Sequence, residues 1–433
     1  MSTLLVGSMG IVFLLVIIFL RVPIGVAMIM TGVGGFMVLS GVEPGFSLLS
    51  SVPYETFINP SYAVVALFVL MGNFAFKSGI SDDLFWAVRK WMGSLRGGLA
   101  LATVAACGGF AAICGSSVAC AITMGVVALP EMMKSRYAKT LATGCIAAGG
   151  TLGILIPPST VMILYGIITE QSIGKLFMAG FIPGLLQMLL YMMVIRIWVR
   201  KHPDAGPAAE SCTFNEKIHS LSRVWSVLLL MFIVVGGLYA GIFSPNEAGG
   251  IGAFGAFVIG LILCRKTTRR SFIKESLIDT IRTQGMCLTI MLGAMIFGYF
   301  LTISRLPMEL SDSITAIVSS PILILICILL IMVLLGCFMD SMAIVLLTVP
   351  IFFPLIQSVG IDPIWFGILV VRVTEMGLIT PPVGLNLYVI QGVSEVPMSS
   401  VFKGVIPFVF CDIVHVMILL MFPILSLWLP GMM

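Results

Sequence analysis

Two short stretches of the chain read almost alike: GILIPPS, from Gly153 to Ser159, and GLITPPV, from Gly377 to Val383. Each places a Pro-Pro pair inside an otherwise apolar run. Proline lacks a backbone N–H donor and disfavours helical geometry at the residue before it, so two in succession interrupt a helix. Inside a bilayer, the carbonyl groups freed in this way must face protein, water or an ion. The sequence therefore predicts two broken membrane helices that line a site, over about 141–168 and 363–393.

The composition is typical of a polytopic, all-α membrane protein. Its 433 residues are 59% hydrophobic and 10% charged, whereas soluble domains average about 45–50% apolar and about 25% charged residues. The apolar run Leu4–Leu20 lacks a basic start and a small-residue cleavage site, which favours a retained span over a signal peptide. Apart from Cys212, the 10 cysteines lie in or beside apolar stretches and form no Cys-x-x-Cys pair. We expect them to be core residues, and we expect no cofactor and no nucleic-acid partner.

Two further apolar stretches are interrupted too early for a full membrane crossing. The first, over about 98–130, breaks at Cys114-Gly115-Ser116-Ser117, and the second, over about 321–359, breaks at Cys337–Ser341. Each is predicted to be a helical hairpin that enters and leaves the membrane by one face. An amphipathic surface helix is expected over Ser81–Leu95. Full spans are predicted at Leu4–Leu20, Val22–Ser40, Tyr62–Phe76 and Leu176–Val199, and again at Val224–Ile242, Ala248–Cys264, Gln284–Thr302 and Val401 to about Leu429.

The two halves of the chain repeat one pattern. Many residues recur 224 positions later, among them Pro157 at Pro381 and Ser117 at Ser341. We therefore predict a first repeat over 1–200, a polar cytoplasmic linker over 201–223 and a second repeat over 224–433.

The predicted topology inverts the second repeat relative to the first. With five crossings in each half, all 23 Lys and Arg residues except Lys175, Arg305 and Arg372 fall on one side, which the positive-inside rule makes cytoplasmic. The first hairpin then opens to the cytoplasm and the second to the outside. Inverted repeats whose broken helices meet near the midplane are typical of secondary transporters.

The hairpin tips carry the oxygen atoms that a hard cation prefers. Gly115, Ser116 and Ser117 stand at the first tip, and Asp340 and Ser341 at the second. Hydroxyl, carboxylate and free carbonyl oxygens, together with the negative ends of half-helices, predict two Na⁺ sites or a substrate site. The alternative is that small residues only allow helices to approach closely.

A few polar residues inside the apolar segments are further candidates. A carboxylate in an apolar run is costly and marks function, so Asp340 is expected to contact hydroxyl groups of the substrate, to help hold a cation or to carry a proton. Ser159, Thr380 and Asn386 flank the proline breaks and can add ligands or simply bond neighbouring helices.

Two charged pairs have the spacing of one helical turn. Arg372 and Glu375 favour a local ion pair over a substrate role. Asp412 and His415 favour a structural pair or a subunit contact over a proton relay.

Several motifs together resemble those of one transporter family. GGFAAICGSSVACAITMG, GGTLGILIPPSTVMILYG, LFMAGFIPGLL, FSPNEAGGIGAF, GCFMDSMAIVLLTVP and TEMGLITPPVGLNLYV are similar to signatures of the large membrane subunit of tripartite ATP-independent periplasmic (TRAP) transporters. The resemblance extends from about Pro23 to Pro407.

The resemblance implies an elevator-type transporter of the bacterial inner membrane, coupled to Na⁺. Its expected partners are a separate small four-helix membrane subunit and a periplasmic binding protein that delivers an organic anion. Substrate ligands would be Ser116, Asp340, Ser159, Thr380 and Asn386. Na⁺ ligands would be Gly115, Ser117, Gly153, Pro157, Ser341, Gly377 and Pro381.

We therefore expect Na⁺-driven uptake of a small carboxylate, such as a C4-dicarboxylate or sialic acid, without covalent chemistry. The nearest alternative is a stand-alone ion or dicarboxylate transporter of related hairpin architecture that needs no binding protein. A membrane enzyme is disfavoured because no nucleophile and base, metal cluster or cofactor motif is present. A purely structural scaffold would not explain the paired proline breaks and Asp340.

Overall fold

The computed structural model describes residues 3–208, 212–264, 268–309, 320–394 and 396–433. Within these ranges the chain forms helices and no β-strand. Among the described residues, eight helices are long and apolar enough to cross a membrane, or up to nine when the bent pair α8 and α9 is taken as one span. The predicted all-α polytopic class is confirmed.

The described residues of the first half form ten α-helices. They are α1 (Thr3–Phe19), α2 (Ile24–Ser40), α3 (Val42–Ile58), α4 (Ala63–Lys77), α5 (Ile80–Met92), α6 (Gly98–Cys114), α7 (Ser117–Lys134), α8 (Lys139–Leu155), α9 (Thr160–Ile168) and α10 (Ile173–Lys201). The described helices of the second half are α11 (Phe214–Met231), α12 (Gly237–Tyr239), α13 (Pro245–Leu263), α14 (Arg269–Ser304), α16 (Pro321–Gly336), α17 (Ser341–Ser358), α18 (Pro363–Leu378), α19 (Leu385–Ser394), α20 (Met398–Met421) and α21 (Ile424–Leu427).

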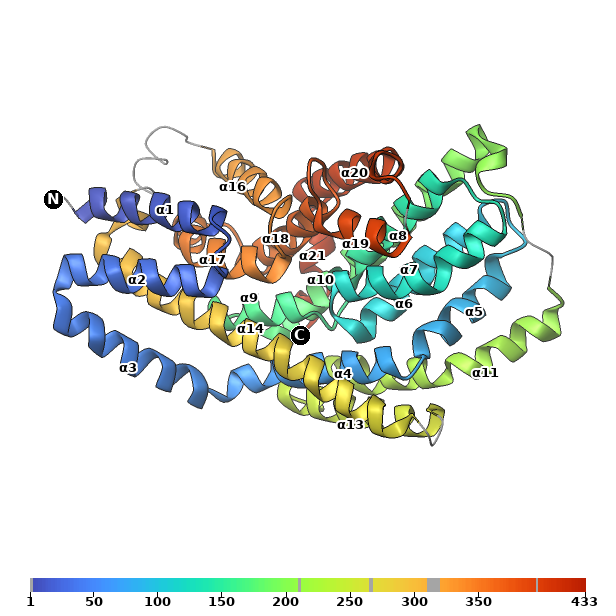
Figure 1. Ribbon diagram of the computed structural model, residues 1–433, viewed down its shortest axis with the longest axis horizontal. Coiled ribbons are helices and arrows are strands. Elements are labelled where there is room, and N and C mark those ends of the chain that lie inside the picture. Colours follow the sequence, from blue (N-terminus) through green and yellow to red (C-terminus); the bar gives the residue numbers. More distant parts are fainter. Residues whose placement is uncertain (1–2, 209–211, 265–267, 310–319, 395) are drawn as a thin grey trace.

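Long helices from the two halves pair reciprocally to form a frame. Helix α2 packs along α14, and α13 packs along α4. Helices α3, α4 and α13 follow the lower edge of the molecule in Figure 1, with α14 running obliquely above them. Small residues permit this close pairing: a methyl group at Gly25 would lie 2.6 Å from the carbonyl oxygen of Thr289 on α14.

The hairpins and broken helices form a second set of reciprocal contacts. Helix α7 of the first hairpin packs on α19, and α17 of the second hairpin packs on α9. Helix α20 likewise packs on α8, while α10 packs on α18. In Figure 1 the first hairpin and the second lie towards opposite ends, with α9, α10 and α18 between them. Such an exchange of equivalent partners is what a two-fold relation between the halves would produce, and the inverted orientation stays a prediction.

Three helices differ from the sequence-based expectation. Helix α3 occupies a segment where no span was predicted, because Glu43, Pro44 and Pro53 interrupt its apolar pattern. Proline in a first turn costs no hydrogen bond, so Pro44 is compatible with the helix. Helix α14 begins at Arg269, well before the predicted Gln284, and α20 ends at Met421 instead of continuing to about Leu429, since Pro423 follows.

The polar linker is shorter than predicted because α11 already begins at Phe214. Thr213 and Glu216 form a capping box, a signal that the sequence did contain. The linker also packs against the turns on either side of the first hairpin: the Tyr137 hydroxyl donates to the Pro207 carbonyl, and the Gly97 amide donates to the Gly206 carbonyl. Of the basic residues assigned to the cytoplasmic side, Arg265 and Lys266 lie outside the described residues.

Candidate functional site

The first hairpin tip rests on the first proline break. Gly115 ends α6 in the left-handed region, with φ of 61°, and Ser116 then caps α7 by accepting a hydrogen bond from the Ala119 amide at 3.4 Å. The Thr160 hydroxyl, at the start of α9, donates to the Gly115 carbonyl at 2.8 Å. A methyl group at Gly153 would lie 2.7 Å from the Ser116 carbonyl oxygen. The predicted residues Gly115, Ser116 and Gly153 are therefore in direct contact.

At the first proline break, the carboxyl end of α8 and the amino end of α9 lie close together and are buried. Helices α8 and α9 bend by 41° around Pro157 and Pro158, both of which are buried. Ser159 caps α9 by accepting a hydrogen bond from the Met162 amide at 3.3 Å. The carboxyl end of α8 and the amino end of α9 thus present partial negative and partial positive charge side by side.

The second hairpin tip is built in the same way against the second break. Asp340 caps α17, with its carboxylate accepting from the Met342 amide at 3.1 Å. The Gly384 amide, at the start of α19, donates to the Cys337 carbonyl at 3.0 Å. At Gly377 a methyl group would lie 2.5 Å from the Gly336 Cα, so only glycine permits this approach of α18 to α16.

The two tips meet at Glu375, a carboxylate whose helical spacing predicts a different partner, Arg372. Glu375 on α18 is fully buried, and its Oε1 accepts a hydrogen bond of 2.6 Å from the Ser341 hydroxyl of the second tip. Ser117, from the first tip, lies beside the same carboxylate. Neither Glu375 Oε2 nor Ser117 Oγ makes a hydrogen bond within the described part of the chain. Two segments more than 200 positions apart therefore share one buried acidic centre.

The remaining predicted residues lie at the second break, which differs from the first in burial. Pro381 and Pro382 are exposed, unlike their buried counterparts in the first half. The Thr380 hydroxyl donates to the Met376 carbonyl of its own helix at 2.6 Å. Asn386 is fully buried, yet neither atom of its amide has a hydrogen-bond partner among the described residues. Asn386 therefore offers a donor and an acceptor to a ligand, whereas Thr380 is already engaged.

The predicted pairing of Arg372 with Glu375 is wrong. Arg372 forms an ion pair with Asp412 on α20, and its Nε donates to His415 Nδ1 at 2.9 Å. Asp412 Oδ1 also accepts hydrogen bonds of 2.7 Å each from Gln187 and Tyr191 on α10. Asp412 and His415 thus belong to one structural network, but through Arg372 and not through a bond to each other. Helical spacing alone missed this because α10 and α20 supply the stronger partners for Arg372.

This arrangement separates two kinds of buried charge. The Arg372 network ties α10, α18 and α20 together with its cation and anion matched. Glu375 has no cationic partner within 4.0 Å in the described structure, although its carboxylate lies at the meeting point of both tips. A buried carboxylate without a counter-charge is costly, so Glu375 with Ser117 and Ser341 forms a place where a bound cation would be stabilised.

Comparison with known proteins places this geometry in context. A family model described as "Tripartite ATP-independent periplasmic transporter, DctM component" matches residues 11–425. The chain is 37% identical over 378 residues to the C4-dicarboxylate TRAP transporter large permease protein of Pseudomonas aeruginosa, covering 87% of this chain and 88% of that protein. It is 30% identical over 414 residues to the sialic acid TRAP transporter large permease protein of Vibrio cholerae, covering 96% of each. Among solved structures, the YdaH transporter of Alcanivorax borkumensis has the same fold, with a TM-score of 0.64 at 16% identity over 90% of this chain and 88% of that one.

The two buried acids should respond differently to neutralisation. We expect Asp412→Asn to lower the free energy of unfolding by about 3–5 kcal/mol, because it leaves Arg372 buried without its counter-charge. Glu375→Gln should cost less than about 1 kcal/mol, since the amide oxygen still accepts from Ser341. Thermal unfolding of the purified variants in detergent, followed by intrinsic fluorescence, measures both.

A double variant separates loss of the pair from loss of packing. Arg372→Met combined with Asp412→Leu should be more stable than either single variant, because neither charge is then left alone. Equal destabilisation by Glu375→Gln and Asp412→Asn would contradict the division of the two acids into separate networks.

Proposed function

We propose, from the premise that this chain belongs to the DctM component family of tripartite ATP-independent periplasmic transporters, that it carries a small organic anion into the cell in symport with Na⁺. As a member of that family it is a large permease subunit, a multi-pass protein of the bacterial inner membrane and not an enzyme. The family implies two partners, a small membrane subunit and a periplasmic binding protein.

The observation that carries the Na⁺ proposal is the meeting of both hairpin tips at Glu375. Ser117 and Ser341 bring hydroxyl oxygens from the two halves to this buried carboxylate. Oxygen donors with one uncompensated negative charge suit a hard monovalent cation. Because the ligands come from both hairpins, binding of the cation would hold the two tips together.

The substrate proposal rests on the relatives and on the helix ends. The two relatives described above carry the names of a C4-dicarboxylate and of sialic acid, both of which are organic anions. The amino ends of α7 and α9 are capped by the neutral side chains of Ser116 and Ser159, so their partial positive charge is available to a carboxylate. The corresponding end of α17 is capped by the acidic Asp340, which favours a substrate hydroxyl or a cation there.

Coupling to Na⁺ supplies the driving force. Each elementary charge that moves inward through a potential of 100 mV contributes about 2.3 kcal/mol. When the entering Na⁺ ions outweigh the charge of the anion, an inside-negative potential drives uptake. An elevator movement is the mechanism we propose, with the hairpins and broken helices sliding as one body against the frame of α2, α4, α13 and α14.

The first test is uptake by the transporter reconstituted in liposomes together with its small subunit and its binding protein. We expect accumulation of the organic anion bound by that protein when Na⁺ is higher outside, and background uptake when K⁺ replaces Na⁺. Uptake that persists without a Na⁺ gradient would remove the coupling proposal. Uptake that needs no binding protein would instead favour a stand-alone transporter of the same fold.

The second test addresses Glu375 and Ser117. In the same assay, Glu375→Gln and Ser117→Ala should each raise the Na⁺ concentration for half-maximal uptake by about tenfold, the equivalent of about 1.4 kcal/mol in cation binding. Glu131→Gln is the matched control, because it neutralises an acid of the first hairpin whose ion pairs, with Arg89 and Lys134, lie at least partly in solvent. An unchanged Na⁺ dependence in both site variants would exclude the tips as the cation site.

The third test addresses the elevator movement. Cys287 on α14 lies 3.4 Å, sulfur to sulfur, from Met342 at the start of α17. Met342→Cys would therefore pair a frame helix with the second hairpin. We expect oxidation or Hg²⁺ to abolish uptake by this variant, reversibly with dithiothreitol, because the hairpin is then fixed to the frame. The control is Met342→Ser under the same oxidant. Full uptake by cross-linked protein, verified by thiol labelling, would rule out sliding at this contact.

A further inference from the structure

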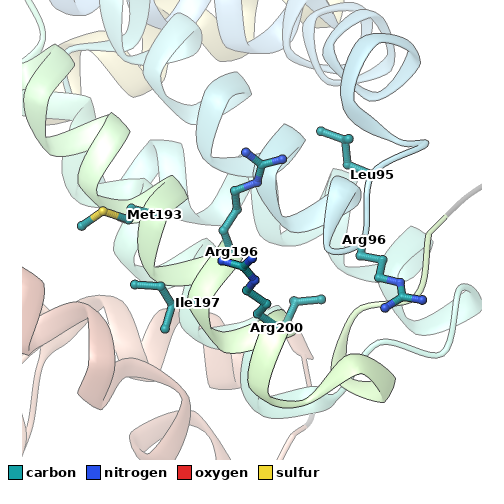
Figure 2. A pocket seen from close by; sticks show the side chains of 7 residues that line it. Leu95, Arg96, Met193, Arg196, Ile197 and Arg200 are labelled. Atoms are coloured by element: carbon teal, nitrogen blue, oxygen red, sulfur yellow. The ribbon is translucent and has the colours of Figure 1, made fainter.

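A basic pocket lies away from the hairpin tips, between the carboxyl-terminal part of α10 and the turn that precedes α6. Its volume is about 580 Å³. Figure 2 shows Arg196 and Arg200 of α10, and Arg96 of the turn, around this hollow together with Leu95, Met193 and Ile197. The pocket therefore combines three guanidinium groups with an apolar rim.

The three arginines lack the partners that neighbouring cations have. Arg96, Arg196 and Arg200 are exposed, and within the described residues none of them forms an ion pair or a hydrogen bond. Nearby basic residues, by contrast, are matched to acids: Arg89 to Glu131, and Arg223 to Asp83. Three unmatched positive charges around one pocket repel each other, so an anion placed among them would be stabilised.

An apolar stripe leads along α10 to this pocket. Leu185, Leu189, Met193 and Ile197 are four residues apart and therefore lie on one face of the helix. All four are exposed, by 38%, 58%, 52% and 48% respectively. Within a predicted membrane span, such a face is one that hydrocarbon chains would cover.

The pocket also lies at the membrane surface where anionic lipids act. Arg96, Arg196 and Arg200 all belong to the side predicted to be cytoplasmic from its excess of Lys and Arg. Basic pockets between transmembrane helices on that side bind acidic lipid headgroups. A topological role alone would explain the presence of positive charge, but would not require three arginines around one hollow at the end of an apolar stripe.

A second cavity adjoins the first. Its volume is about 680 Å³, and it shares Ile197 with the first pocket. Its lining includes Trp198, Lys201 and Lys403. The two cavities thus place two groups of cations next to one turn of α10. A lipid with two phosphates could present one phosphate to each group.

We propose that the pocket of Arg96, Arg196 and Arg200 binds the phosphate of an anionic phospholipid of the cytoplasmic leaflet, with acyl chains along the α10 stripe. A two-phosphate lipid such as cardiolipin fits best, because its second phosphate reaches the Lys201 and Lys403 cavity. Because the pocket lies beside the turn that precedes the first hairpin, the lipid bound there would depend on which anionic lipids the membrane contains. This proposal does not depend on Na⁺ coupling.

The test is lipid binding by the purified transporter complex, measured by native mass spectrometry after addition of cardiolipin, phosphatidylglycerol or phosphatidylethanolamine. We expect cardiolipin to bind best and phosphatidylglycerol next, each at least about tenfold more tightly than phosphatidylethanolamine. The triple variant Arg96→Gln, Arg196→Gln, Arg200→Gln should lose this preference. The matched control is Lys139→Gln, Lys274→Gln, Arg282→Gln, which removes the same charge from exposed residues outside both cavities and should keep it.

Three results would overturn the proposal. They are equal binding of all three lipids, an unchanged preference in the pocket variant, and an equal loss in both triple variants, which would indicate surface charge alone. Competition with inorganic phosphate identifies the source of the anion: displacement of cardiolipin by millimolar phosphate would indicate a site for free anions. Single Arg196→Lys, which keeps the charge, should bind lipid normally and so controls for folding.

Discussion

A hydrogen bond between Ser341 and Glu375 is the interaction on which the proposed site depends. It holds the second hairpin tip to α18, and Ser117 brings the first tip to the same carboxylate. Each hairpin interrupts its helix at the tip, so the backbone groups freed there need partners from the rest of the protein. The first tip finds them in the Thr160 hydroxyl and the second in the Gly384 amide, each at a proline break. Each hairpin tip is therefore bonded to a proline break, where a residue of the break donates a hydrogen bond to a free carbonyl of the tip.

The Arg372 network holds in place the helices next to the hairpin tips and the proline breaks. It joins α10, α18 and α20 through an ion pair and three hydrogen bonds. The ion pair and two of these hydrogen bonds are made by Asp412 Oδ1. Glu375 lies on the same helix, three residues further on, so the position of its carboxylate is set by a helix that the network fixes. A buried ion pair adds little net stability compared with apolar packing, but it specifies which helices meet. Here it orients the helix that presents Glu375 to both tips.

The two halves are similar in design and different in surroundings. Serine caps the helices at the first tip and the first break, while aspartate caps the helix at the second tip. The first proline break is buried and the second is exposed. This difference gives the site one neutral, enclosed side and one acidic, more open side, which suits a ligand that carries charge at one end and hydroxyl groups at the other.

The sequence by itself determined the membrane class, the helix interruptions near residues 115 and 340, and the two proline breaks, because proline, glycine and helix-capping residues act through their own backbone. It also contained the capping box that starts α11. It did not predict α3, because prolines interrupt the apolar pattern of that helix. It also did not predict the partners of the buried charges. Arg372 and Glu375 have the spacing of an ion pair, yet the one binds Asp412 and the other Ser341. Only the tertiary structure decided this, since a charge buried in an apolar interior pairs with whichever group packing brings closest, and those groups are distant in the chain.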